Sequence, residues 1–289
     1  MSEREKGIAS KTARDMSMTD HHKENRQPAS GSAQFLDTEL LATLSHELRS
    51  PLAIIKGYVT TLLRYDQMIE QNERIDFLRA IDEGSDRLTN SIDRLMDLAM
   101  IESGALVLNP VMSSLPYLLR TAISKYGSDR QFNVNYTSCS GLPLTDDILL
   151  QVDQTHMLTV FMNIIDNAVK YSTIDSAIDI LITPLCTEEE KQHLPATIQA
   201  DIDISNIITI SIRNYGEGIL EDNLEQIFGR FQRLEFGLSR DVNGLGLGLT
   251  ISRYLVELHH GSMWIESQVG VSTTVHILLP INTQHLSKD

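Results

Sequence analysis

The most regular pattern near the start of the chain is a stripe of apolar residues within residues 35–63. Neighbouring members lie three or four positions apart, which places their side chains along one face of a helix. The stripe consists of Leu41, Leu44, Leu48, Leu52, Ile55, Val59 and Leu62. This spacing predicts an amphipathic helix that buries one face.

A second stripe follows a polar break at residues 65–73, and its spacing continues a heptad pattern. Its members are Leu78, Ile81, Ser85, Leu88, Ile92, Leu95 and Ala99. Ser103 and Gly104 are expected to end this second helix. Two such helices predict an antiparallel hairpin over residues 34–104 whose apolar stripes are only partly covered. We therefore expect a homodimer through this region, in which two hairpins form a four-helix bundle.

The pattern then changes, and residues 105–283 alternate between helical and strand-like periods. Helices are predicted at residues 115–126 and 157–172, and Asp153 is in place to cap the second one. Strands are predicted at residues 132–137, 178–183, 207–213, 262–267 and 273–279. The acidic segment 184–206 between two of these strands is long for a compact domain, which predicts an insertion loop.

Composition excludes several classes of protein. The chain has 289 residues, of which 42% are hydrophobic, a share typical of globular proteins with one or two domains. It carries 24 Lys and Arg against 39 Asp and Glu, a net charge of -15, so nucleic acid is an unsuitable partner. Cys139 and Cys186 stand far apart, which argues against a disulfide framework or a structural zinc site.

The ends of the chain and its hydropathy indicate a cytoplasmic location. Residues 1–33 are polar and nearly free of large aliphatic side chains, which predicts a flexible leader. Residues 284–289 form a short tail. No apolar run reaches the length of about 18 residues that crosses a bilayer, so no membrane span is expected in this chain.

His46 is the first candidate for chemistry. It lies about 200° around the predicted helix from Leu44 and Leu48, so it points away from the buried face. Glu47 beside it could hold a ring nitrogen as the free base or accept its proton. Pro51 removes one helical hydrogen bond and should bend the helix just beyond the histidine. Without these neighbours, His46 would be interpreted as an ordinary surface residue.

A second candidate site lies on the helix at residues 157–172. Asn163, Asn167 and Lys170 share one face of it, and apolar residues occupy the opposite face. Amide oxygens suit Mg²⁺, and an ammonium group can bind phosphate oxygens. Taken singly, each asparagine is equally compatible with an exposed polar helix face.

Two glycine-containing segments complete the candidate chemistry. Gly216 and Gly218 follow a predicted strand and would let the backbone approach a flat ligand, although such pairs are more often turns. Gly244, Gly246 and Gly248 precede an amphipathic helix, so that backbone N–H groups and a helix N-terminus can converge on phosphate.

These segments together resemble the catalytic core of sensor histidine kinases. Ser45–Pro51, SHELRSP, is similar to the phosphoacceptor box. Met157–Ser172 resembles the N box, Asn214–Ile219 the first glycine box, Ile227–Arg233 the F box and Asn243–Ser252 the second glycine box. Four nucleotide-site boxes in the family's order are specific, whereas any one alone is a modest signal. The resemblance covers about residues 35–279.

The resemblance implies a fold, cofactors and site residues. The fold is a dimerising helical hairpin followed by an α/β sandwich that binds ATP and Mg²⁺, with a lid at residues 232–243. Asn163 and Asn167 would hold the metal. The reaction would involve His46, Glu47 and Ser50. The nucleotide would contact Asn163, Asn167, Lys170, Tyr171, Asn214, Gly216, Gly218, Ile219, Phe228, Arg230, Phe231, Arg233, Gly244, Leu245, Gly246, Leu247, Gly248 and Leu249.

Two positions depart from the family pattern. Ser50 stands where the family usually has a threonine, which predicts weak or altered phosphatase activity. Asn214 replaces an aspartate that accepts a hydrogen bond from the adenine amino group. An amide oxygen can accept the same bond without the charge that strengthens it. ATP binding is therefore expected to be weaker, and Asn214→Asp should tighten it.

The resemblance implies that His46 attacks the γ-phosphate of ATP and later passes the phosphoryl group to an aspartate of a separate response-regulator receiver domain. Glu47 would keep one ring nitrogen deprotonated. Two alternatives stay open at this point. One is a nucleotide-poor pseudokinase that dimerises and docks a regulator. Asn214, in place of the family's aspartate, suggests this alternative. The other is an ATPase of the same superfamily without a phosphohistidine, against which SHELRSP argues.

Overall fold

The structure of the protein is a computed structural model that describes residues 30–127, 130–137, 148–185, 187, 191–192, 194–199, 206–232 and 245–281. The chain divides into two compact units, Met1–Glu39 and Leu40–Asp289. Most of the predicted leader, residues 1–29, lies outside the described residues, as does the tail from residue 282. The first helix already begins at Ser30, before the predicted end of the leader at residue 33.

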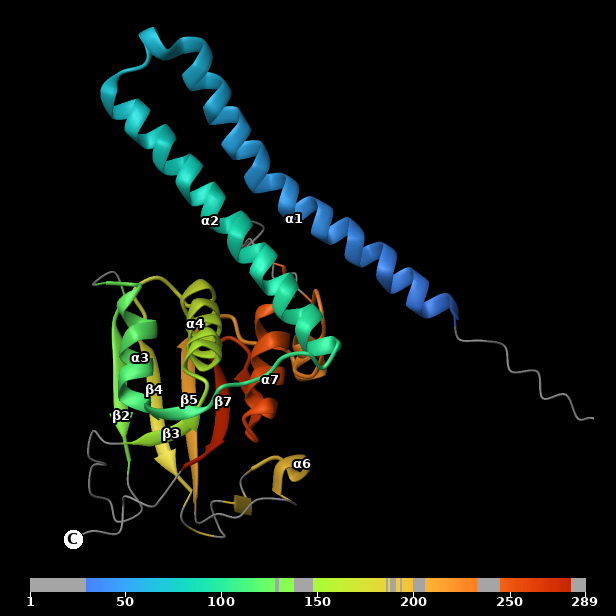
Figure 1. Cartoon of the computed structure of the whole chain (residues 1–289). Helices are drawn as coiled ribbons and strands as arrows, with labels where there is room; N and C mark the ends of the chain where they lie inside the picture. Colours follow the sequence, from blue (N-terminus) through green and yellow to red (C-terminus); the bar gives the residue numbers. More distant parts are fainter. Residues whose placement is uncertain are drawn as a thin grey trace, which may run out of the picture. The chain divides into compact units, whose positions relative to one another are not determined.

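The predicted helical hairpin is present, and all of it from Leu40 onward belongs to the second unit (Figure 1). Helix α1 (Ser30–Tyr65) is followed by the short 3₁₀ helix η1 (Asp66–Met68) and by α2 (Gln71–Glu102). A capping box starts α2, because the side chains of Glu70 and Glu73 each accept a hydrogen bond from the backbone of the other residue. Gly104, with φ of 65°, follows the end of α2, as the sequence predicted.

The two helices of the hairpin meet at a glycine. Gly84 of α2 is buried, and a Cβ atom at this position would lie 3.0 Å from Ile55 Cγ1 and 3.5 Å from the carbonyl oxygen of Pro51. The glycine therefore permits close packing beside the proline of α1. Further along, the rings of Tyr58 and Phe77 pack with centroids 5.0 Å apart.

The apolar stripes of the hairpin are only partly covered in the single chain. Leu52 is 54% exposed on α1, and on α2 the exposed fractions are 52% for Leu78 and 47% for Ile92. Large aliphatic side chains at this exposure leave an apolar surface along the hairpin. The prediction that one hairpin leaves its stripes uncovered is confirmed.

The remainder of the unit is built on a five-stranded sheet in the order β2-β4-β5-β7-β6. Its strands are β2 (Phe132–Tyr136), β4 (Ile178–Pro184), β5 (Ile207–Tyr215), β6 (Ser262–Gln268) and β7 (Ser272–Pro280). β2 and β4 are parallel, and the other neighbouring pairs are antiparallel. All five predicted strands are present, with ends that differ by one or two residues.

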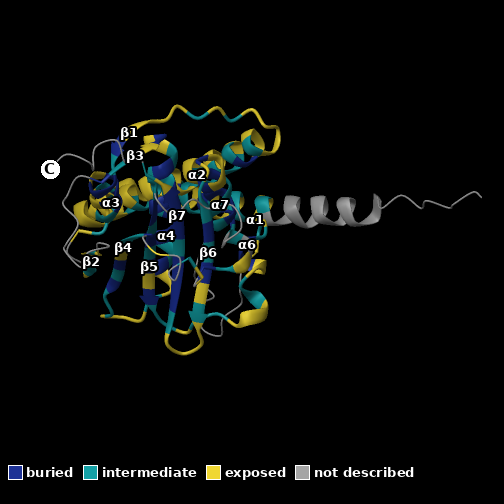
Figure 2. Ribbon diagram, turned by 90° about the horizontal axis from the view of Figure 1, so that it is seen from below, coloured by how far each residue is buried: buried dark blue, intermediate teal, exposed yellow. Residues whose placement is uncertain are grey.

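Three helices cover one face of this sheet (Figure 1). They are α3 (Leu115–Ser124), α4 (Gln154–Lys170) and α7 (Gly248–Leu258), and α4 packs between the other two. Strand β5 alternates as expected for a sheet with one covered face, since Ile208, Ile210 and Ile212 are buried against the helices. Asn214 continues this alternation, so it lies on the helix-covered face at the end of β5. Figure 2 shows the buried residues gathered between the helices and the sheet.

Three short features were not predicted. β1 (Val111–Ser114) and β3 (Leu149–Val152) form a separate antiparallel pair. Within the predicted insertion, the short helix α6 (Ala196–Gln199) contributes to a small apolar cluster. The buried members of that cluster are Leu185, Leu194, Ile207 and Leu278. The described part of the insertion is therefore packed against the sheet.

Candidate functional site

Helix α4 positions the polar trio predicted from the sequence. Asp153 caps its N-terminus by accepting a hydrogen bond from the backbone N–H of His156. The apolar face of α4 is buried in the main core through Val160, Phe161, Ile164, Ile165 and Ala168, as predicted. Asn163, Asn167 and Lys170 all line the same cavity beside the helix.

This cavity has a volume of about 380 Å³, which lies within the range of small-molecule sites. Its walls come from α4, the end of β5, the segment after β5 and the start of α7. The predicted residues that line it are Asn163, Asn167, Lys170, Tyr171, Asn214, Gly216, Gly218, Ile219, Gly246, Gly248 and Leu249. The structure thus brings together residues from the N box and both glycine boxes around one open space.

Asn163 lies deep in this site and is only 5% exposed. Its amide Nδ2 lies 3.4 Å from both the carbonyl oxygen of Gly248 and the hydroxyl of Ser252, two acceptors on α7. Its Oδ1 accepts a hydrogen bond of 3.2 Å from Arg94 Nη2. The two acceptors on α7 and the guanidinium donor of Arg94 fix the orientation of the Asn163 amide, with Nδ2 toward α7 and Oδ1 toward Arg94.

Asn214 is also buried, with 7% of its surface exposed. Its Nδ2 donates a hydrogen bond of 3.3 Å to the carbonyl oxygen of Tyr171, the residue that ends α4. The remaining polar atom of this side chain, Oδ1, is an acceptor beside the cavity. Asn214 thus keeps an acceptor for the adenine amino group at a position where the family has an aspartate.

Three glycines at the cavity are needed because neighbouring backbone leaves no room for a Cβ atom. A Cβ atom at Gly216 would lie 2.2 Å from the carbonyl oxygen of Tyr171. At Gly218, where φ is 72°, it would lie 2.5 Å from the carbonyl oxygen of Gln268. At Gly246, where φ is 66°, it would lie 2.8 Å from the carbonyl oxygen of Gln232. Each glycine permits a close approach between two segments that line the site.

Several predicted site residues lie elsewhere. The side chains of Leu245 and Leu247 are buried in the main core, Phe228 is 8% exposed, and Phe231 packs against the same core. Core packing therefore describes the side chains of both phenylalanines. Arg230 forms an ion pair with Glu102 at the end of α2. Arg233, Gly244 and the lid from residue 233 onward lie outside the described residues.

The predicted phosphoacceptor region lies on α1. His46 and Ser50 are exposed, and Glu47 is half-buried. The expectation that the imidazole points away from the packed face is therefore confirmed. Within the described part of the chain, no group of three or more His, Cys, Asp and Glu side chains is arranged to hold a metal ion. Oxygen donors suited to Mg²⁺ do line the cavity, namely the amides of Asn163 and Asn167 and the carboxylates of Asp166 and Glu217.

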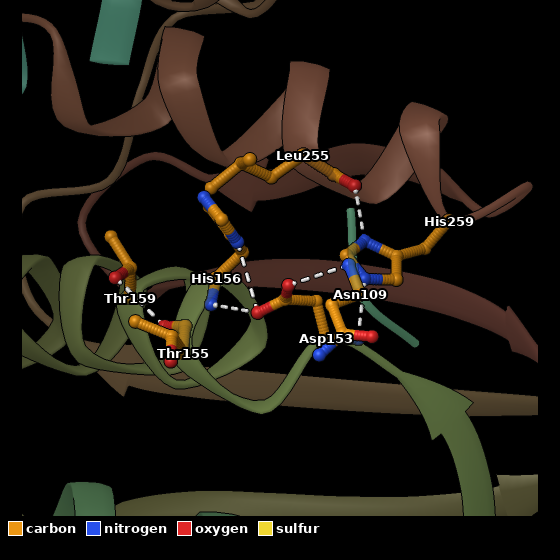
Figure 3. A network of polar contacts seen from close by, with 7 residues as sticks. All are labelled: Asn109, Asp153, Thr155, His156, Thr159, Leu255 and His259. Carbon is orange, nitrogen blue, oxygen red and sulfur yellow. Dashed lines mark hydrogen bonds and ion pairs between the residues drawn. The ribbon is translucent and has the colours of Figure 1, made fainter. Parts of the chain in front are cut away.

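Sequence reasoning missed a polar network at the start of α4 and the end of α7 (Figure 3). Asp153 accepts hydrogen bonds from the backbone N–H groups of Asn109 at 2.9 Å and His156 at 3.1 Å. Its own backbone N–H donates to His259 Nε2 at 2.9 Å, while His259 Nδ1 lies 2.7 Å from the carbonyl oxygen of Leu255. The network links the segment after α2 to the start of α4 and to the end of α7.

Two pKa values are shifted in this network. Burial alone would raise the pKa of Asp153, but hydrogen bonds from Asn109 and His156, with the nearby His156 ring, lower it to about 2. Burial lowers the pKa of His259, which keeps its ring neutral with Nδ1 as donor and Nε2 as acceptor. The role of His259 could not be predicted from the sequence, because its partner Asp153 is 106 positions away.

Comparison with known families agrees with the fold and the site. Residues 37–104 match the model of the His Kinase A (phospho-acceptor) domain. Residues 152–283 match the model of the histidine kinase-, DNA gyrase B- and HSP90-like ATPases. A phosphoacceptor hairpin followed by an ATPase domain of this kind defines a class of signalling kinase. The chain belongs to the sensor histidine kinases and contains their catalytic core.

The chain is also similar to individual sensor proteins. It is 28% identical over 246 residues to the sensor protein SrrB of Staphylococcus aureus (strain MRSA252), a match that covers 84% of this chain and 38% of SrrB. The chain thus spans less than half the length of that relative. Among the described residues, no helix is long and apolar enough to cross a membrane.

Two solved structures share the fold. The histidine kinase AdeS of Acinetobacter baumannii is 17% identical, with a TM-score of 0.56, and the match covers 82% of this chain and 98% of AdeS. The histidine kinase ThkA, in a structure of its complex with the response regulator protein TrrA, is 18% identical with a TM-score of 0.54. That match covers 93% of this chain and 69% of ThkA.

Proposed function

We propose that this chain is an ATP-dependent histidine autokinase that phosphorylates His46 and passes the phosphoryl group to an aspartate of a response regulator. The observation that carries the proposal is the cavity of about 380 Å³, around which the N-box face of α4 and both glycine segments converge. An exposed histidine on the hairpin of the same chain supplies the acceptor.

In the proposed site, the end of β5 receives the adenine. Asn214 Oδ1 accepts a hydrogen bond from the adenine amino group, and its Nδ2 is held by the Tyr171 carbonyl. The glycines at 216 and 218 shape the adjacent wall. Gly246, Gly248 and the first backbone N–H groups of α7 lie on the side where phosphates would bind.

The residues also fit a divalent metal with the nucleotide. Asn163 and Asn167 would hold Mg²⁺ through their amide oxygens, and Lys170 would contact phosphate oxygens. When bound, Mg²⁺ offsets the negative charge of the phosphates. The neutral ring of His46 forms the new N–P bond as the bond from the γ-phosphorus to the ADP oxygen breaks. Glu47 accepts the proton that leaves the ring.

The partners follow from the same chemistry. A second copy of the hairpin would cover the exposed stripes of α1 and α2 and give the four-helix bundle. The phosphohistidine would donate its phosphoryl group to an aspartate of a separate receiver domain, and the likeness to ThkA, solved with a response regulator protein, supports a partner of this kind. Because ATP is the donor, the proposed activity places these domains in the cytoplasm.

Two measurements test the proposal. Calorimetric titration with ATP and Mg²⁺ should show saturable binding of one nucleotide per chain, which excess ADP abolishes. Incubation with γ-labelled ATP should then leave acid-labile, base-stable label on the protein. A chain that binds ATP and hydrolyses it without retaining label would contradict the proposal, as would a chain that binds no ATP.

A further inference from the structure

The last turns of α2 make polar contacts with two residues that were predicted to bind the nucleotide or its metal. Arg94 lines the cavity, and its Nη2 donates to Asn163 Oδ1 at 3.2 Å. About two turns further along the helix, Glu102 forms an ion pair with Arg230. Residues 94–102 of α2, here called the clamp segment, thus engage one predicted metal ligand, Asn163, and one predicted nucleotide contact, Arg230.

The clamp segment is also attached by apolar packing. Leu98 is 7% exposed and belongs to the main core of the ATPase domain. Leu95 and Ile101 pack against the same core, and α2 contacts α7. Leu95 was predicted as part of the hairpin seam, so this contact diverts one seam residue toward the ATPase domain. The two polar contacts therefore belong to an interface between α2 and the ATPase domain that also contains apolar packing.

The contact at Asn163 bears directly on metal binding. The side chain is held by acceptors on α7 at Nδ2, so its Oδ1 is the atom directed at Arg94. Mg²⁺ binds amide oxygens at about 2.1 Å and requires a strict arrangement of ligands. A guanidinium that donates to the same oxygen occupies that position and repels a second cation. The Arg94 guanidinium at Asn163 Oδ1 therefore opposes binding of Mg²⁺ at the same atom.

We propose that the clamp segment is autoinhibitory, and that Arg94 and Mg²⁺ compete for Asn163 Oδ1. Binding of Mg²⁺ with ATP would then require release of the clamp segment, which also frees Arg230 from Glu102. Because such coupling is reciprocal, any change of the hairpin that withdraws the clamp segment would raise the affinity for Mg²⁺-ATP. This inference deepens the proposed function and depends on it.

The test compares Arg94→Met with Arg87→Met, a matched change on the same helix. Arg87 is exposed and pairs with Glu83 at 3.9 Å, away from the cavity. Methionine keeps an apolar stem but cannot donate a hydrogen bond. The quantity measured by calorimetry is the ratio of ATP affinities with Mg²⁺ and with a chelator.

The expected result is a ratio that rises about tenfold in Arg94→Met, which is the scale of one hydrogen bond to a charged group, and is unchanged in Arg87→Met. A ratio that stays constant in Arg94→Met would overturn the competition. A fall in Mg²⁺-ATP affinity would also overturn it, because it would make Arg94 a phosphate ligand. Loss of ATP binding in the wild type would contradict the proposed function, and with it this inference.

A second readout does not depend on substitution. Hydrogen exchange of the wild-type backbone at residues 95–102 should become faster when Mg²⁺-ATP is added, and should change less with ATP and a chelator. Exchange at residues 71–85, at the other end of α2, serves as the internal comparison. Equal protection of residues 95–102 in all three conditions would overturn release of the clamp segment.

Discussion

The backbone N–H of Asp153 donates a hydrogen bond of 2.9 Å to Nε2 of His259, joining the start of α4 to the end of α7. The bond requires a neutral imidazole, because a protonated ring would present an N–H at this atom. Burial of His259 lowers its pKa and favours that neutral form. The packing of two helices that line the cavity therefore depends on the protonation of one histidine.

This relationship predicts a pH-dependent stability. Since the pKa of His259 is lower in the folded protein, the unfolded chain binds the proton first, and the free energy of unfolding falls as pH drops below about 6.5. His259→Gln removes one titrating group and should reduce this dependence between pH 7 and pH 5, while His276, whose pKa is also lowered by burial, keeps its own contribution. Denaturant unfolding across this range measures it, with His260→Asn, an exposed neighbour, as control. An equal loss in wild type and His259→Gln would contradict the prediction.

Glycine at 216 is predicted to be required for stability. In Gly216→Ala, the new Cβ would meet the Tyr171 carbonyl oxygen at 2.2 Å, so backbone must move at the edge of the cavity. We expect a loss of about 1–3 kcal/mol in the free energy of unfolding, together with weaker ATP binding. Gly57→Ala is the comparison, because its Cβ meets nothing within 4 Å and alanine favours a helix. Similar effects of both changes would exclude the steric explanation.

Asn214→Asp is predicted to strengthen ATP binding and to lower the stability of the nucleotide-free protein. Asn214→Asp should tighten ATP binding, since a charged oxygen accepts the adenine hydrogen bond more strongly. The same change removes the bond from Nδ2 to the Tyr171 carbonyl and should lower the stability of the nucleotide-free protein by about 1 kcal/mol. Calorimetry and thermal unfolding measure the two effects. Asn214→Leu, which lacks the acceptor, should weaken ATP binding; equal affinity in all three proteins would show that Asn214 does not contact adenine.

The exposed stripes of the hairpin predict the oligomeric state. Leu52 and Ile92 are 54% and 47% exposed and lie on the predicted stripes, so charging them in Leu52→Glu with Ile92→Glu should shift a dimer toward monomers. Sedimentation velocity over a range of concentrations measures this shift. Leu63→Glu is the control, because Leu63 is 80% exposed and lies off the stripe. A dimer unaffected by the double change would place the interface elsewhere.

Sequence reasoning predicted the elements with strong periodicity and the residues around the cavity. Helix α4 was recognisable because its polar trio and its apolar residues occupy separate faces, and β5 because Ile208, Ile210 and Ile212 alternate along it. β1 and β3 have four residues each, too few for a periodic signal. Short strands of this kind are defined by their partners rather than by their own pattern.

Contacts between distant positions could not be predicted. Arg94 and Asn163 are 69 positions apart, and Asp153 and His259 are 106 positions apart. Nothing in the local pattern of α2 distinguishes Arg94 from the exposed arginines of the same helix. The role of Gly216 and Gly218 was anticipated for the approach of a ligand, whereas the structure shows that they first accommodate the carbonyl groups of Tyr171 and Gln268.

Transfer of the γ-phosphoryl group of ATP to His46 is tested most directly by finding which residue carries the label from γ-labelled ATP. Wild type, His46→Gln and His260→Asn are incubated with γ-labelled ATP and Mg²⁺, and the acid-labile label is quantified and mapped by mass spectrometry at neutral to basic pH. We predict phosphohistidine at position 46 in the wild type and in His260→Asn, and no label in His46→Gln. An unlabelled wild type, or label that persists in His46→Gln, would contradict phosphorylation of His46.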